Sequence, residues 1–220
     1  HNDFEDIKGQ YGAKRAAEIA AAGGHNMLLV GTPGSGKTML AKSMPSILPE
    51  LTFNEALEIT KIQSITGIME AGEGIASERP FRSPHHSAST AALVGGGQKA
   101  MPGELSLAHY GVLFLDAFPE FSKDVLESLR QPLEDGVVTI TRASAKATYP
   151  ADFMLIAAMN PCPCGYYGSR MQECRCKPYE IAKYRNRISG PLLDRLDMHV
   201  EMAEVGYSDI TSNKPGESSA

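Results

Sequence analysis

Residues 27–38 read MLLVGTPGSGKT, and this stretch decides the fold. The apolar run MLLV, bounded by turn-forming residues, predicts a short buried strand. The loop at 31–38 matches the pattern G-x-x-x-x-G-K-[ST] in full, and the residues after it predict a helix. A strand, such a loop and a helix in this order predict a phosphate-binding loop, because the loop amides and the helix N-terminus attract phosphate oxygens.

Residues of the loop at 31–38 have expected roles in binding ATP or Mg²⁺. Gly34 and Gly36 let the backbone turn so that its amides face phosphate. Lys37 is expected to reach the β- and γ-phosphates of ATP, and the Thr38 hydroxyl to bind Mg²⁺. A chance glycine-rich turn is the alternative, and the full match in a strand–loop–helix frame argues against it. The predicted ATP-binding residues of the loop are Pro33, Gly34, Ser35, Gly36, Lys37 and Thr38.

A second buried strand ends in a carboxylate. Residues 112–116 read VLFLD, which places Asp116 at the carboxyl end of the strand, where open α/β sheets bind their ligands. An aspartate there can bind Mg²⁺ together with Thr38. The alternative is an aspartate that only begins a turn. The next residue is Ala117, which offers no acceptor.

The rest of the chain alternates apolar strands with helices. Further strands are predicted at 153–159 and 199–202, and helices at 12–22, 54–66, 122–130 and 179–187. Residues 71–103 are rich in Gly, Pro, Ser and His, and we interpret them as an insertion or mobile loop. Residues 137–149 alternate around ASAK and predict a β-hairpin. This order predicts a mostly parallel sheet covered on both faces.

Composition narrows the class of protein. A chain of 220 residues with a net charge of -5 predicts one large α/β domain and excludes a surface that is basic throughout. No apolar run reaches the ~18 residues of a membrane span. The acidic first ten residues do not form a signal peptide, and together with clustered cysteines they favour a reducing cytoplasm.

Several long strings of the chain resemble one family. These strings are DIKGQYGAKRAAEIAAAGGHNMLLVGTPGSGKT, PFRSPHHSAS, PGELSLAHYGVLFLD, RQPLEDGVVTITRA, AAMNPCPCGYYG and NRISGPLLDRLD. The sequence is identified as a member of the magnesium-chelatase-like family of AAA+ ATPases, in the branch that contains ComM and YifB proteins. The resemblance covers about residues 4–204. It implies a P-loop NTPase fold, a three-layer αβα arrangement with a β-hairpin insertion.

The resemblance also implies a domain organisation. We expect residues 1–204 to form the AAA+ core and residues 205–220 a polar tail that leads toward a helical lid. Members of the family usually carry that lid and an N-terminal domain resembling the Lon protease C-terminal fold, and neither is matched in these residues.

Further site residues follow from the resemblance. Asn160 matches the polar sensor residue, with a turn-capping asparagine as the alternative. Arg195 matches the arginine finger presented to a neighbouring subunit, with an ion pair to Asp194 or Asp197 as the alternative. Gly9 matches the adenine-side loop. The family has Glu where this chain has Ala117, so the water-activating group is missing; a natural loss and an altered sequence both account for the exchange.

Four cysteines form a pattern of their own. Cys162, Cys164, Cys174 and Cys176 give C-x-C-x9-C-x-C, and four thiolates are what a closed structural Zn²⁺ site needs. Each pair has one intervening residue, however, where zinc ribbons usually have two to four. Free thiols and disulfides remain as alternatives.

Local basic patches are the candidate DNA contacts. Residues 165–187 carry a positive balance, and the resemblance implies that Arg82 and Lys146 face the pore of a hexameric ring, where basic loops can follow a phosphate backbone. A solvated surface is the alternative. The resemblance favours a hexameric ATP-driven motor that acts on DNA in branch migration during recombination and transformation. A chelatase-type subunit for metal insertion into a tetrapyrrole and a non-hydrolysing nucleotide-dependent scaffold remain open.

Overall fold

The computed structural model describes residues 11–69, 74–143 and 145–204. Gly9 and the polar tail at 205–220 lie outside the described residues. The chain divides into two compact units whose segments alternate along the sequence. The first unit comprises His1–Leu48, Leu115–Glu120 and Ile156–Ala220, and the second comprises Pro49–Phe114 and Phe121–Leu155.

A five-stranded sheet has the strand order β2-β5-β8-β1-β9. Its strands are β1 (Met27–Val30), β2 (Phe81–Arg82), β5 (Val112–Leu115), β8 (Met154–Met159) and β9 (Met198–Glu201). The pairs β1–β8, β1–β9 and β2–β5 are parallel. Every residue of β5 and β8 is buried, as expected for strands covered on both faces. The predicted parallel α/β sheet is therefore confirmed.

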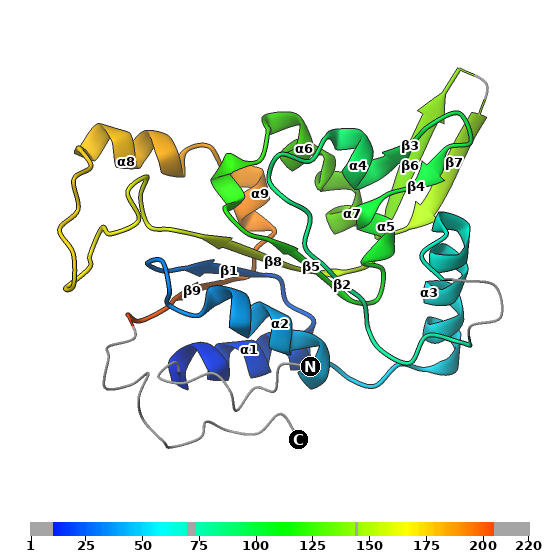
Figure 1. Ribbon diagram of the computed structural model, residues 1–220, viewed down its shortest axis with the longest axis horizontal. Helices are drawn as coiled ribbons and strands as arrows, with labels where there is room; N and C mark the ends of the chain where they lie inside the picture. Colours follow the sequence, from blue (N-terminus) through cyan, green and yellow to red (C-terminus); the bar gives the residue numbers. More distant parts are fainter. Residues whose placement is uncertain (1–10, 70–73, 144, 205–220) are drawn as a thin grey trace. The chain divides into compact units, whose positions relative to one another are not determined.

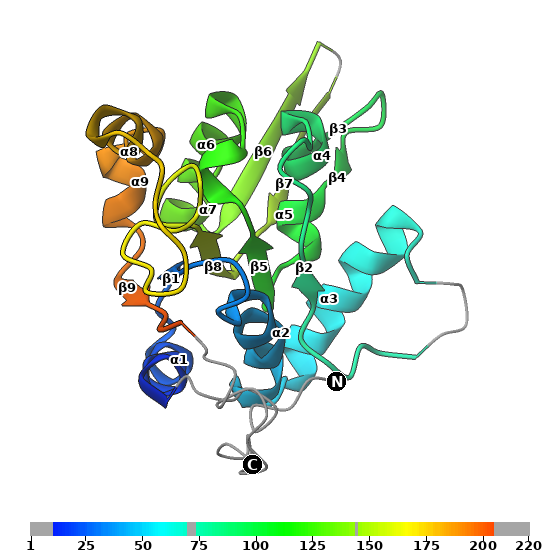
Figure 2. The same cartoon turned by 60° about the vertical axis from the view of Figure 1, so that its left-hand side comes forward.

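Register in the first unit positions the site. Val30 at the end of β1 lies level with Met159 at the end of β8, so the loops that follow these two strands leave the sheet at the same edge. Helices α1 (Tyr11–Gly23) and α2 (Lys37–Ile47) lie on one face of β1 and β9, and α9 (Gly190–Asp194) lies on the other (Figure 1 and Figure 2). The remaining helices of this unit are η2 (Phe118–Glu120) and α8 (Pro178–Arg185).

The alanine-rich helix α1 shows why these elements pack. Ala13, Ala17, Ala20 and Ala21 are all buried, and their spacing puts them on one helical face. Small side chains on that face allow α1 to approach the neighbouring α2 and β9, with which it packs. The predicted helix at 12–22 is confirmed.

The second unit contains one long helix, α3 (Phe53–Thr66), and several short elements. The short elements are β2, α4 (Thr90–Val94), β3 (Gly95–Gly96), β4 (Met101–Pro102), α5 (Glu104–Leu107), most of β5, α6 (Lys123–Ser128), α7 (Arg130–Asp135), β6 (Val137–Arg142) and β7 (Ala145–Pro150). Thr52 and Glu55 form a capping box at the start of α3, which fixes where that helix begins. Strands β6 and β7 pair antiparallel, so the predicted hairpin is confirmed.

Two predictions in this unit were wrong. Residues 71–103 are not a structureless insertion, because β2, α4 and the β3–β4 pair lie within them; these elements are too short to give a periodic pattern. The sequence also predicts that Pro132 ends the helix at 122–130, and this is wrong because α6 already ends at Ser128. The chain instead starts a new helix, α7, and Pro132 lies in its first turn, where a missing amide costs no hydrogen bond.

Among the described residues, no helix combines the length and the apolar character needed to cross a membrane.

Candidate functional site

The phosphate loop, residues 31–38, connects β1 to α2. Gly34 and Gly36 have φ values of 80° and 94°, in the left-handed region that glycine adopts without strain. The Ser35 amide donates to the Thr32 carbonyl at 3.2 Å, which closes the turn. No side chain caps the N-terminus of α2, so the first-turn amides are available to an anion.

Lys37 lies at the base of this loop. Its Nζ donates to the carbonyl oxygen of Gly31 at 2.5 Å, to that of Thr32 at 3.1 Å and to Asn160 Oδ1 at 3.1 Å. Burial lowers the pKa of Lys37 from its ordinary value, and the negative charge of Asp116 partly opposes that shift. The structure thus brings Lys37 and Asn160 together, with Asp116 close enough to act on the ammonium group.

The two predicted magnesium ligands are both exposed. Thr38 follows Lys37 in the first turn of α2, and Asp116 directly follows the buried strand β5. Asp116 Oδ1 accepts a hydrogen bond from the Ala117 amide at 2.9 Å. A hydroxyl and a carboxylate are oxygen ligands of the kind that Mg²⁺ prefers, so the residues present fit this ion.

Ala117 adopts a left-handed backbone conformation, with φ of 53°. This region costs a non-glycine residue roughly 1–2 kcal/mol, so the turn after Asp116 is strained. The nearby Glu120 is a carboxylate that already has a side-chain partner. It lies at the end of η2, where Oε1 accepts from Arg187 Nη1 at 3.2 Å.

Arg195 follows α9 in an exposed position, and its carbonyl oxygen accepts from Asn26 Nδ2 at 3.3 Å. Asp197, one of the two carboxylates considered as its partner, interacts with His25 Nδ1 at 3.4 Å and accepts from the Asn26 amide at 3.4 Å. A finger role for Arg195 concerns a neighbouring subunit and stays a prediction.

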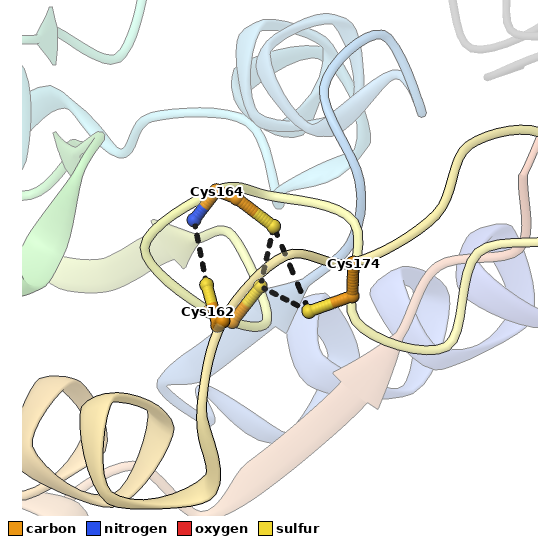
Figure 3. A group of neighbouring side chains, drawn as sticks. Cys162, Cys164 and Cys174 are labelled. Carbon is orange, nitrogen blue, oxygen red and sulfur yellow. Dashed lines mark hydrogen bonds between the residues drawn. The ribbon is translucent and has the colours of Figure 1, made fainter.

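The cysteine loop, residues 161–177, follows β8 and brings all four cysteines together. Their sulfur atoms lie within 4.8 Å of one another, and the group meets the geometric requirement of a metal site. Figure 3 shows the thiols of Cys162, Cys164 and Cys174 pointing toward one another. Cys162 is fully buried and the other three are half-buried.

The cysteine loop also contacts the phosphate loop. Gly165 is so close to Pro33 that a Cβ built on it would lie 3.1 Å from the Pro33 ring carbons and 3.5 Å from Asn160 Nδ2. Its φ is 92°, which favours glycine as well. Sequence reasoning missed this contact, because nothing in either loop's sequence indicates which residues of the other it meets.

A cavity of about 500 Å³ lies beside the phosphate loop, and sequence reasoning did not predict it. Its lining includes Gly31, Thr32, Pro161, Tyr167, Arg185 and Glu204. Arg185 is fixed there by a bond from Nε to the Pro161 carbonyl at 3.2 Å and by stacking over the Tyr167 ring at 5.7 Å. The basic balance of residues 165–187 was the one signal for Arg185.

The two DNA-contact candidates lie in different surroundings in the second unit. Arg82 forms a two-pronged ion pair with Glu104, at 2.7 and 2.8 Å, which raises the pKa of the guanidinium further. Lys146 is exposed near the turn of the β6–β7 hairpin, opposite Thr141. Of the two, only Lys146 lies exposed near the end of a hairpin, where a side chain can contact the phosphate backbone of DNA.

Residues 3–210 match the family described as magnesium chelatase, subunit ChlI. The chain is 50% identical over 220 residues to protein YifB of Escherichia coli, covering all of this chain and 43% of that protein. It is 50% identical over 219 residues to competence protein ComM of Haemophilus influenzae, covering 99% of this chain and 42% of that one. The identity to the magnesium-chelatase 67 kDa subunit of Chlorobaculum parvum is 31% over 165 residues, covering 72% and 23% of the two chains.

Solved structures show the same fold. NtrX of Brucella abortus in complex with ATP superposes with a TM-score of 0.56 at 14% identity, covering 88% of this chain and 35% of that one. The ADP complex gives 0.55 at 15% identity, covering 87% and 34%. The chain thus spans less than half the length of the curated relatives YifB and ComM, at 43% and 42%.

Proposed function

This chain belongs to the family of magnesium chelatase subunit ChlI, and from that premise we propose that it is the ATP-binding module of a hexameric, ATP-driven motor that acts on DNA. The observation that carries the proposal is the position of Lys37. Its ammonium group lies at the base of a complete phosphate loop and bonds to Asn160 from the neighbouring strand. This arrangement supports binding of a nucleoside triphosphate.

Each site residue then has a task. The amides of the phosphate loop and Lys37 bind the phosphates, while Thr38 and Asp116 hold Mg²⁺. When bound, Mg²⁺ neutralises charge on the phosphate oxygens. Asn160 orients the attacking water from the end of β8, a position supported by its bond to Lys37. Arg195 reaches the ATP of the next subunit in the ring, which is where its positive charge acts.

Ala117 makes hydrolysis by this chain slow. A methyl group cannot accept a proton from water, and loss of a general base typically lowers the rate by about 10²–10⁴-fold. Binding does not depend on that group, because Lys37, Thr38 and Asp116 are all present. We therefore infer a module that binds ATP and hydrolyses it poorly.

The decisive experiment is Ala117→Glu. ATP turnover is expected to rise by about 10²–10⁴-fold, since the carboxylate restores a base next to Asp116. Turnover is measured with and without forked DNA over a range of chain concentrations, because Arg195 needs a neighbouring subunit. Ala117→Gln is the matched control: it imposes the same left-handed backbone cost without a base. Equal turnover in the Glu and Gln variants, with ATP bound in both, would contradict the role given to this position.

The choice of DNA as substrate has weaker support. The relatives at 50% identity include a protein named for competence, whereas the relative named as a magnesium-chelatase subunit is 31% identical. Lys146 is exposed near the turn of the hairpin, where a cation can contact a phosphate backbone. Lys146→Glu is expected to weaken binding of forked DNA without changing ATP affinity. Unchanged DNA binding would contradict the role given to Lys146. A parent chain that binds a tetrapyrrole-carrying partner and does not bind forked DNA would favour the chelatase alternative.

A second function is favoured by Ala117 itself. A chain without a general base can act as a scaffold in which bound ATP controls assembly only. The two functions differ in one measurement. If Ala117→Glu turns over ATP but DNA never changes that rate, the scaffold is the better account.

A further inference from the structure

The four sulfur atoms of the cysteine loop are arranged as a metal ion would require. The distances are 3.4 Å from Cys162 to Cys164, 3.7 Å from Cys162 to Cys174 and 3.6 Å from Cys164 to Cys174. A zinc ion bound to four thiolates at about 2.3 Å places neighbouring sulfurs roughly 3.8 Å apart in a tetrahedron. We propose that Cys162, Cys164, Cys174 and Cys176 bind one structural Zn²⁺, and that this ion holds the cysteine loop against the phosphate loop.

Backbone amides support the thiolate form of these cysteines. The Cys164 amide donates to Cys176 Sγ at 3.3 Å, and the Tyr167 amide donates to Cys162 Sγ at 3.3 Å. Such bonds stabilise negative charge on sulfur, which a ligand to zinc must carry. They come from the turn that contains Gly165, so the conformation of the loop itself builds the site.

A set of disulfides fits these distances less well. Cys162, Cys164 and Cys174 form a near-equilateral triangle, in which no pair is distinguished from the others. Two disulfides would separate the four sulfurs into two bonded pairs. One shared ion instead explains why the three measured separations are so similar.

Charge near the cluster is compatible with this ion. A zinc tetrathiolate carries a net charge of about -2, because four thiolates outweigh one Zn²⁺. The loop itself and the helix after it contain Arg170, Arg175, Lys177 and Arg185. The same segment contains Glu173 and Glu180, so its balance stays positive, and a positive segment is compatible with a negatively charged centre.

The ion would act on the nucleotide site through two short links. Asn160, which accepts from Lys37, lies two residues before Cys162 along the chain. Gly165, in the turn that contains Cys164, packs against Pro33 of the phosphate loop. A metal that fixes the loop therefore fixes Asn160 as a positioning residue and supports Pro33. This second part rests on the proposed ATP site, whereas the metal site does not.

The first test measures metal directly. The purified chain is expected to contain about one zinc per chain, and less than about 0.2 would overturn the site, since closed four-cysteine sites bind tightly. Cobalt exchanged into the site is expected to show the strong visible absorption of tetrahedral thiolate coordination. Octahedral or absent absorption would overturn the coordination proposed here.

A pair of variants separates coordination from folding. Cys176→Ser removes a ligand and is expected to release most of the zinc, whereas Cys176→His offers a nitrogen ligand and is expected to retain it, because three cysteines and one histidine also form structural zinc sites. Circular dichroism shows whether both variants fold. Equal zinc content in the folded Ser variant and the parent chain would contradict the ligand set.

The link between the zinc site and the nucleotide site is tested by ATP affinity. Binding of a fluorescent ATP analogue is compared before chelation, after chelation and after zinc is restored. We expect affinity to fall severalfold on chelation and to recover with zinc. Unchanged affinity in the zinc-free, folded chain would overturn the coupling while leaving the metal site intact. A chain that contains zinc but never binds ATP would instead contradict the proposed function.

Discussion

The phosphate loop and the cysteine loop follow neighbouring strands, β1 and β8, and leave the sheet at the same edge, but different interactions fix them. The phosphate loop is contiguous in sequence and is held by its own backbone and by the bonds of Lys37. The cysteine loop brings together side chains from two separate pairs, and the proposed zinc ion would be their shared partner. A loop of the first kind is complete when the chain folds, whereas one of the second kind, with the proposed ion, would depend on a supply of metal.

The largest effect is expected for Lys37→Ala, which tests whether ATP binding by the phosphate loop can be lost without loss of zinc from the cysteine loop. Lys37→Ala removes a buried cation from the phosphates, and we expect ATP affinity to fall by about 10- to 100-fold, the cost of charge-assisted hydrogen bonds. Isothermal titration with ATP and Mg²⁺ measures this loss, and zinc content is measured on the same sample. Zinc content is expected to stay at the parent value. Unchanged ATP affinity would contradict the assignment of the phosphate loop.

A second prediction concerns the contact between the loops. Gly165 and Gly168 both have positive φ, at 92° and 81°, but only Gly165 has neighbours within contact distance of a built Cβ. Gly168→Ala should cost about 1 kcal/mol of unfolding free energy through backbone strain alone. Gly165→Ala adds a tight contact with the Pro33 ring, at 3.1 Å, and is expected to cost about 1 kcal/mol more.

Chemical denaturation compares these two variants, and ATP titration shows which of them reaches the nucleotide site. Only Gly165→Ala is expected to weaken ATP binding. Equal effects of both variants on stability and on affinity would mean that the contact between the loops carries no energy.

Acid is expected to release metal from the thiolates of the cysteine loop, because protons compete with the metal for sulfur. Before a loss of stability in acid is assigned to the cysteine loop, the contribution of other titrating groups must be known. His109 in the second unit is buried, and burial lowers its pKa below the ordinary value, against the pull of the nearby Glu58 carboxylate. Its Nδ1 accepts from the Asp152 amide at 2.9 Å, which requires the neutral ring.

The unfolded chain therefore takes up the proton first, and stability that is present above the ordinary histidine pKa is lost as pH falls below it. His109→Asn keeps an acceptor for Asp152 and is expected to flatten this part of the profile. Unfolding midpoints between pH 5 and 7, about the range over which histidine titrates, test this. A profile as steep as that of the parent chain would show that other groups are responsible.

The smallest effect is expected at the ion pair between Glu120 and Arg187, whose side chains are both about half exposed. Exposed pairs contribute about 0.2–1 kcal/mol, so Glu120→Gln should barely change the unfolding midpoint. It should also leave the residual ATP turnover unchanged, because Glu120 is directed toward Arg187. A clear loss of turnover would identify Glu120 as the group that activates water in place of a residue at 117.

Features that depend on a short contiguous stretch of residues could be predicted from the sequence. The phosphate loop, the buried strands and the hairpin all follow from local pattern, and the structure places Lys37 and Asn160 together as the strand order requires. Short elements escaped prediction, since β2 has two residues and α4 has five, too few for a periodic pattern to repeat. The packing of Gly165 on Pro33 escaped it for a different reason: it depends on the three-dimensional path of two distant loops.

The cysteines fall between these cases. Their number indicated zinc, and their one-residue spacing argued against it. The structure shows how the short spacing can still converge, because the turn at Gly165 brings Cys162 and Cys164 onto the same side as the second pair. Spacing rules derived from zinc ribbons describe a different turn.

The hydrogen bond between Asp116 and the Ala117 amide also bears on ion selectivity. It uses one of the two lone pairs of Oδ1 and none of those of Oδ2. Mg²⁺ is satisfied by single carboxylate oxygens and retained waters in an octahedral shell, whereas Ca²⁺ prefers more oxygens and often takes both from one carboxylate. At the proposed ion site this bond therefore favours coordination through one oxygen of Asp116, the mode that suits Mg²⁺, and because the donor is a backbone amide the bond does not require a particular side chain at position 117.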